Sequence, residues 1–323
     1  TIDEIVHTSE IYLPIWAAGN ERMNLDPVVA PEPQESGFSS TTAHFVAMTN
    51  EFLEKNDAPN RKSDERPRSF LNSRLSNLIP EACCKNVLTV GENLSGGASS
   101  YGPTDDLRIK PDIMASSGGG SSQALAALKP EIVDPNFDVS YRQFQGTSFA
   151  AAAVTGGMAL VRQRWQQLHP DGAPVLASTW KALAIASTSN GSPGPKVGYG
   201  NFKCAEAVRL VEKDAAGRVA GKSARIVELL LEDGESCEFA ISRVPSEFQL
   251  RVVACWTDPK GISPAVSIDP RDAMLINDID VRVGALTQSA TTLRPFWSTR
   301  ATTSETTLRS LMWNWLLRRR NSS

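Results

Sequence analysis

A helix that starts with a glycine, a threonine and a serine is the feature that most restricts the fold of this chain. Small residues fill its first turns, in the run Gly146-Thr147-Ser148-Phe149-Ala150-Ala151-Ala152-Ala153-Val154-Thr155-Gly156. Side chains of this size favour a helix packed inside the fold rather than on its surface. Apolar residues continue at helical spacing to Leu168, and His169-Pro170 ends the pattern. We therefore expect an interior helix over residues 148–168.

Short apolar segments before this helix predict strands. Residues 11–18 form a compact apolar run that ends at a glycine, and further strands are expected at 86–90 and 109–115. A second helix is predicted over 174–188. Strands that alternate with helices indicate a parallel-sheet α/β domain, which we place at residues 1–215.

Three regions depart from the α/β pattern. Residues 26–82 are rich in proline, serine, asparagine and charge, which predicts a surface insertion. Residues 223–290 contain short strands separated by turn residues, which predicts an antiparallel β-sandwich. The tail, residues 291–323, follows neither pattern. The strands expected in the sandwich are 226–231, 237–241, 248–256 and 280–283.

Composition excludes few classes of function. The 323 residues carry a net charge of −3, which gives no reason to expect a nucleic-acid partner. No run of about 18 apolar residues exists, so no membrane span is predicted. Five cysteines without a CxxC pair or paired histidines predict free thiols, with disulfides as the alternative.

The position of Ser148 suggests chemistry. A serine in the first turn of a helix lies among backbone N–H groups without intrahelical acceptors, at the positive end of the helix dipole. Both favour the negative charge that develops when a hydroxyl attacks a carbonyl. The alternative is an ordinary N-cap serine on a helix of small residues.

Six segments resemble, in the same order, motifs of the subtilisin-like serine proteases (subtilases), and they span residues 1 to about 211. The resemblance implies a three-layer subtilisin-like fold. The segments are Ala17-Ala18-Gly19-Asn20, Ser99-Ser100-Tyr101-Gly102-Pro103, Lys110-Pro111-Asp112-Ile113-Met114-Ala115, the Gly146–Gly156 run (family GTSxAAPxxxG), Lys181-Ala182-Leu183-Ala184-Ile185-Ala186-Ser187-Thr188, and Gly198-Tyr199-Gly200.

The resemblance implies a role for individual residues. Ser148 matches the nucleophile that forms the acyl-enzyme. Asn20 matches the side-chain donor of the oxyanion hole, with the Ser148 N–H as second donor. Ala18 and Gly19, beside Asn20, would bind the polypeptide substrate. Family resemblance also favours a secreted, extracellular protein, which the composition itself leaves undecided.

The acid and base of the family's triad are not found in this sequence. In subtilases a DxG and then an HGTxxA motif precede the oxyanion asparagine, but only nineteen residues precede Asn20 and they contain neither. None of the three histidines, His7, His44 and His169, is followed by Gly-Thr. The chain starts at Thr1 without a leader, so we expect an N-terminally truncated fragment that is inactive alone. The alternative is a non-catalytic binding or scaffold protein on a degenerate subtilase fold.

Two departures from the family pattern are local. Ala152 stands at the family proline of the serine motif, and Ala115-Ser116-Ser117 replaces the family APG, a change expected to alter the loop beneath the site.

The C-terminal region also carries a resemblance. Trp256-Thr257-Asp258-Pro259 and Leu275–Val281 resemble segments of the jelly-roll-like sandwich domain that follows the catalytic domain in some large subtilases. Asp278 and Asp280 leave structural calcium open, although with Asn277 they do not make a ligand set, and no cofactor is predicted.

Overall fold

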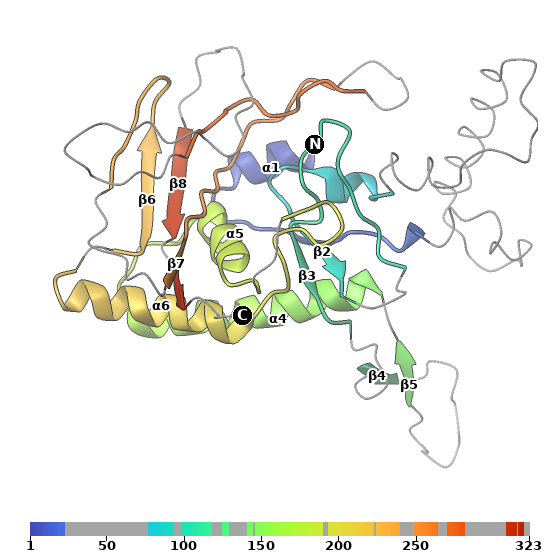
Figure 1. Cartoon of the computed structure of the whole chain (residues 1–323), viewed down its shortest axis with the longest axis horizontal. Helices are drawn as coiled ribbons and strands as arrows, with labels where there is room; N and C mark the ends of the chain where they lie inside the picture. The colour runs from blue at the N-terminus through green and yellow to red at the C-terminus, as the bar shows by residue number, and fades with distance from the viewer. Residues whose placement is uncertain are drawn as a thin grey trace, which may run out of the picture.

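The computed structural model describes about three fifths of the chain. Side chains are described for residues 1–22, 77–93, 98–117, 146–189, 193–222, 224–239, 251–263 and 270–281, and the backbone alone for 125–128, 141–144, 248–250, 308–314 and 316–319. A small parallel sheet with helices packed against it forms the centre of the molecule (Figure 1).

The central sheet has three parallel strands in the order β1 (Ile15–Ala17), β2 (Leu88–Glu92), β3 (Ile113–Ala115). Val90 of β2 pairs with Ala17 on one side and with Ile113 on the other. Every residue of β2 and β3 is buried, as expected for parallel strands covered on both faces. The predicted α/β class is therefore confirmed. Strands β1 and β3 are shorter than the apolar runs that predicted them, and β2 is shifted by two residues from the predicted 86–90.

The predicted interior helix is α4 (Thr147–Leu168), which packs along all three strands and beside α6 (Cys204–Val219) (Figure 1). It buries one stripe of apolar residues, with Val154, Met158 and Val161 in its middle. The second predicted helix is α5 (Ala177–Ala186), shorter at both ends than expected. The sequence did not predict α6. The chain starts with α1 (Ile2–Thr8), which Thr1 and Glu4 cap reciprocally.

The C-terminal strands pair in a way that the sequence did not predict. The strand β6 (Ile226–Leu231) has the predicted bounds and pairs with β8 (Leu308–Asn314) of the tail, while β7 (Phe248–Arg251) pairs with β9 (Leu316–Arg319). These are two separate two-stranded antiparallel sheets, so the sandwich stays a prediction.

Several predicted strands were wrong or lie outside the described residues. Residues 237–239 and 252–256 form no strand, and neither do 280–281. An unpredicted hairpin pairs β4 (Leu125–Leu128) with β5 (Tyr141–Phe144).

Most of the predicted insertion at 26–82 lies outside the described residues, but its last six residues pack into the fold. They include most of the short 3₁₀ helix η2 (Pro80–Cys83). Ala82 is fully buried, and the Ile79 N–H donates to the Ala18 carbonyl at 3.2 Å. Of these six residues only Ala82 is buried and Pro80 is exposed, so the surface insertion stays a prediction.

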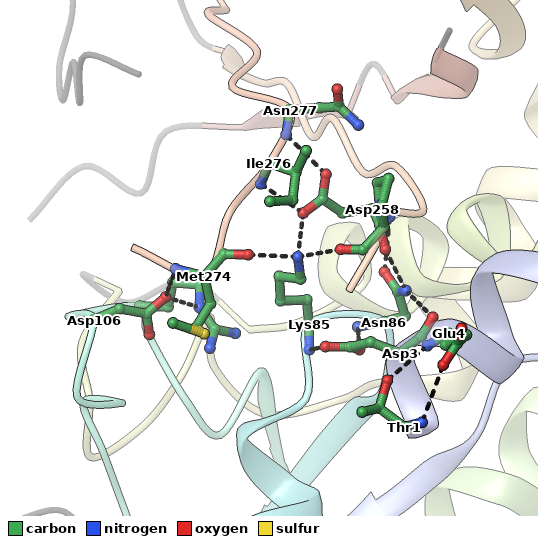
Figure 2. A network of polar contacts seen from close by, with 12 residues as sticks. Thr1, Asp3, Glu4, Lys85, Asn86, Asp106, Asp258, Met274, Ile276 and Asn277 are labelled. Atoms are coloured by element: carbon green, nitrogen blue, oxygen red, sulfur yellow. Dashed lines mark hydrogen bonds and ion pairs between the residues drawn. The ribbon is translucent and has the colours of Figure 1, made fainter. Parts of the chain in front are cut away.

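The segment after β7 is fastened to the start of β2 by a buried polar network (Figure 2). The Lys85 ammonium donates to the Asp258 carboxylate and to the carbonyls of Pro259 and Met274. The Asn86 side chain bonds both the N–H and the C=O of Asp258. These contacts join residues 258–259 and 274–277 to the same packed body as the parallel sheet.

The sequence predicted free cysteines and no membrane span. All five cysteines are free, of which Cys255 is buried and Cys237 exposed. Within the described residues, none of the helices is both long and apolar enough to cross a bilayer.

Candidate active site

The start of α4 lies at the carboxyl edge of the parallel sheet (Figure 1). Hydrogen bonds from Gly19 and Asn20 to Thr147 bring the predicted site residues together there. Asn20 follows β1, Glu92 is the last residue of β2, and Ser117 lies just after β3. Carboxyl ends of parallel strands meet at one edge, which is where open α/β folds bind ligands. Segments far apart in the sequence are thereby brought to the first turn of the helix that carries Ser148.

The side chain of Asn20 is held by Thr147, the neighbour of Ser148. Its Oδ1 accepts hydrogen bonds from the Thr147 N–H at 2.9 Å and from the Thr147 hydroxyl at 3.1 Å. The hydroxyl in turn accepts from the Gly19 N–H at 3.2 Å. Because both bonds to Asn20 end on its oxygen, they fix which way its amide faces and leave the Nδ2 group as a donor.

The backbone around Asn20 is fixed from the other side by Ser100. The Ser100 N–H donates to the Gly19 carbonyl at 2.8 Å, and its hydroxyl accepts from the Glu21 N–H at 3.1 Å. Gly19 has φ +109°, and an added Cβ would lie 2.9 Å from both Ile79 and Ser100 atoms. Only glycine suits this position.

Ser148 lies exposed in the first turn of α4. The Thr147 N–H donates to Asn20, and those of Phe149 and Ala150 donate to the Gly146 carbonyl. Among the described residues, neither the N–H nor the hydroxyl of Ser148 has a hydrogen-bond partner. The hydroxyl therefore has no base beside it in this part of the chain, and the N–H is available as a donor.

The two histidines that the structure describes form no hydrogen bond with Ser148. His169 follows the last residue of α4, at the opposite end from Ser148, and 22 residues of helix separate the two ends by about 30 Å. His7 lies in the last turn of α1. His44 lies outside the described residues.

Ala18 and Gly19, the predicted substrate-binding residues, are both buried. The Ala18 N–H donates to Val90 and its carbonyl accepts from Ile79, while both backbone groups of Gly19 are bonded as described above. Neither residue offers a free backbone group to a substrate. Their role in substrate binding stays a prediction, and it would rest on packing alone.

The sequence did not predict two further polar residues at this edge, Glu92 and Ser117. One carboxylate oxygen of Glu92 accepts from the Gly146 N–H at 3.1 Å and from the Ser117 hydroxyl. Both residues are buried. Ser117 stands at the glycine of the family's APG segment, so the departure visible in the sequence marks a residue that contacts the start of α4.

The model of the Subtilase family matches residues 2–201 of the chain. The chain belongs to the subtilase family. Subtilases are serine proteases, so polypeptide is the substrate class of the family.

This subtilase is similar to several known proteins. The serine protease/ABC transporter B family protein tagA of Dictyostelium discoideum is 23% identical over 231 residues, which are 63% of this chain and 13% of that protein. The chain thus spans about an eighth of that relative's length. The Clostridium perfringens CspB protease is 23% identical over 42% of this chain and 29% of its own, with a TM-score of 0.34. The prenylagaramide maturation protease PagA is 17% identical over 56% and 70%, with a TM-score of 0.32.

At the opposite edge of the sheet, the KPDI segment of this subtilase forms a buried charge cluster. Asp112 pairs with the ammonium groups of Lys110 at 2.7 Å and Lys181 at 3.2 Å. Burial by itself raises the pKa of Asp112, but the two cations and the Thr89 N–H lower it below its ordinary value. Burial lowers the pKa of Lys110 to about 8. The cluster joins strands and α5, far from Ser148, so its role is structural.

The described residues contain no group of three or more histidine, cysteine or acidic side chains placed to bind a metal. The Asn277 N–H donates to Asp258, which ties this residue into the buried network. Partial burial and the charge of Asp280 raise the pKa of Asp278.

Proposed function

We propose that this chain is the nucleophile-bearing part of a subtilisin-like serine endopeptidase. Ser148 would attack the scissile carbonyl and form the acyl-enzyme, with the oxyanion held by the Asn20 Nδ2 group and the Ser148 N–H. The observation that carries this proposal is the pair of hydrogen bonds from Thr147 to the Asn20 oxygen, because they orient the amide as a donor beside Ser148.

The electrostatics of the helix start support the same assignment. A tetrahedral intermediate places negative charge near the first turn of α4, where the N–H of Ser148 has no other acceptor in the described part of the chain. The positive end of a 22-residue helix also lies there. Both groups are held in place before a substrate arrives, which is what makes such donors effective.

We propose that the activating acid and base belong to a polypeptide segment outside residues 1–323. An unactivated serine hydroxyl is a weak nucleophile, and loss of the histidine alone costs about 10⁶ in kcat in subtilisin, a figure measured on that enzyme. The exposed face of α4 supports a docking place for this segment. In its first half this face consists of small or apolar residues, whereas the exposed residues after Val161 are charged or polar. The residues of the first half are Ala152, Ala153, Thr155, Gly156, Ala159 and Leu160.

Two further features support this docking place. No heavy atom lies within 4 Å of a Cβ built on Gly156, so the face is open there. The strand β1 is also an edge strand among the described residues and offers unpaired backbone groups to an added strand.

A serine-directed fluorophosphonate probe tests the proposal, because labelling requires an activated hydroxyl. We expect no labelling of the chain alone, and labelling of Ser148 after a polypeptide with the DxG and HGTxxA motifs is added. Ser148→Ala is the control that must abolish the signal. Rapid labelling of the chain alone would show that a base within residues 1–323 was missed.

Absence of labelling under both conditions would favour the alternative, a non-catalytic scaffold on a subtilase fold. The specific observation behind this alternative is that neither described histidine forms a hydrogen bond with Ser148. We further propose that the α/β part covers residues 1–215, that residues 223–290 belong to a β-sandwich, and that the protein is extracellular, with structural calcium as an option.

A further inference from the structure

A buried acid lies directly behind the turn that presents Ser148. Glu92 is 3% exposed, and its Oε1 bridges the Gly146 N–H and the Ser117 hydroxyl. Its own N–H is held by the Ser99 hydroxyl at 3.0 Å. The side chain thus joins the end of β2 to the loop after β3 and to the start of α4.

The start of α4 needs an external acceptor. Gly146 is the N-cap, has φ +141° and carries no side chain that could cap the helix. A side chain there would also crowd Asn20, whose amide atoms lie 3.4 Å from a Cβ built on Gly146. The cap must therefore come from another element, and a carboxylate at the positive end of a helix is a strong one.

We propose that Glu92 is a positioning residue for the nucleophile turn. By accepting the Gly146 N–H, it fixes the peptide that precedes Thr147 and Ser148, so the Thr147 groups that orient Asn20 and the free Ser148 N–H keep their places. This inference rests on the proposed function of Ser148 and Asn20. It also gives a role to Ser117, which departs from the family pattern: its hydroxyl donates a second hydrogen bond to the Glu92 carboxylate and helps to hold it in place.

Glu92 is not placed to act as the base itself. Its second oxygen, Oε2, is buried and has no hydrogen-bond partner, and no hydrogen bond joins Glu92 to Ser148 among the described residues. A general base must lie within hydrogen-bond reach of the proton it takes. The chemistry of the side chain is therefore that of a fixed acceptor.

Two substitutions at one position separate these roles. Glu92→Gln keeps an oxygen that can accept from Gly146 and Ser117, whereas Glu92→Ala removes it. Hydrogen–deuterium exchange of the chain alone reports on the turn without any activity. We expect the Gly146 amide to exchange at least about 10-fold faster in Glu92→Ala, and to stay near the wild-type rate in Glu92→Gln. Amides of α6 serve as the control for global unfolding and should not change.

The fluorophosphonate reaction, with the complementing polypeptide present, reports on Ser148. Glu92→Ala should slow labelling about 10²-fold, the scale of a 1 Å misplacement of a catalytic group, and Glu92→Gln should restore it. Ser117→Ala, which leaves the Glu92–Gly146 bond intact, should give a smaller loss and covers the case in which Glu92→Ala does not fold.

Three results would overturn the inference. They are wild-type exchange at Gly146 in Glu92→Ala, exchange in Glu92→Gln as fast as in Glu92→Ala, and loss of labelling in Glu92→Gln, which would make Glu92 a base. If even the wild-type chain is never labelled, the proposed function fails, and the exchange data still decide whether Glu92 holds the turn.

Discussion

Replacing Lys85 by methionine should destabilise the protein strongly, because it leaves a buried carboxylate without its cation. The side chains of Lys85 and Asp258 are only 5% and 2% exposed. The substitution also leaves the carbonyls of Pro259 and Met274 without their donor (Figure 2). Breaking a buried pair by removing one partner costs about 3–5 kcal/mol, so we expect a loss of that size in the free energy of unfolding.

Asp258→Ala should cost at least as much as Lys85→Met. It removes the counter-charge of Lys85 and also the acceptor of the Ile276 and Asn277 N–H groups, each at 2.9 Å. The double variant should lose less than the sum of the single losses, by about 1–3 kcal/mol, because the two residues interact directly.

Urea unfolding followed by tryptophan fluorescence measures these losses. The matched control is Lys260→Met, two residues from Asp258, which removes an exposed ion pair with Glu4 of α1. That variant should unfold at the wild-type midpoint, since exposed pairs contribute little. A loss below about 1 kcal/mol for Lys85→Met, or strict additivity in the double variant, would refute the reasoning.

Three further predictions concern the two edges of the sheet. Gly19→Ala should displace Asn20, because the new Cβ would lie 2.9 Å from Ile79 and Ser100 atoms at a φ of +109°; fluorophosphonate labelling in the complemented protein should fall while the unfolding transition stays cooperative. Asn20→Ala should slow that labelling by about 10²–10³, and an unchanged rate would remove Asn20 from the oxyanion hole. Lys110→Met should remove a rise in stability with pH. The pKa of Lys110 is about 8 in the folded chain and 10.5 in the reference state. Between these pH values the unfolded chain binds more protons than the folded chain, so the free energy of unfolding rises with pH. Equal pH slopes for wild type and Lys110→Met between pH 8 and 10.5 would contradict this assignment.

The helices show what the sequence can and cannot reveal. The bounds of α4 follow from its apolar stripe and from His169-Pro170, which are local signals. The helix α6 was missed because its buried face includes Asp214, which breaks the apolar pattern. That carboxylate accepts hydrogen bonds from the N–H groups of Arg225 and Ile226 at the start of β6. Asp214 is therefore buried because of a contact with another element, which the local sequence of the helix does not reveal.

The same distinction applies to the site. Ser148 and Asn20 were predicted because each lies in a segment that resembles a motif, and the structure places Asn20 against the residue before Ser148. Glu92 could not be predicted, since an acid at the end of an apolar strand has no meaning until the Gly146 N–H and Ser117 are placed beside it. The Asn86 side chain that holds the backbone of Asp258 is likewise a tertiary contact that the sequence does not reveal.

The two edges of the parallel sheet have different roles: the amino edge carries stabilising buried charges, and the carboxyl edge carries the candidate active site. The buried charges of Lys85, Lys110 and Asp112 lie before β2 and β3, and they fasten the C-terminal segment and α5 to the amino edge. The groups that orient Ser148 lie at the carboxyl edge, where Asn20 and Glu92 contact the start of α4. Strands β2 and β3 are fully buried and paired with each other, so they form a fixed support between the two edges. Substitutions in the Lys85 network should therefore lower stability while leaving the hydrogen exchange of Gly146 in the folded protein unchanged.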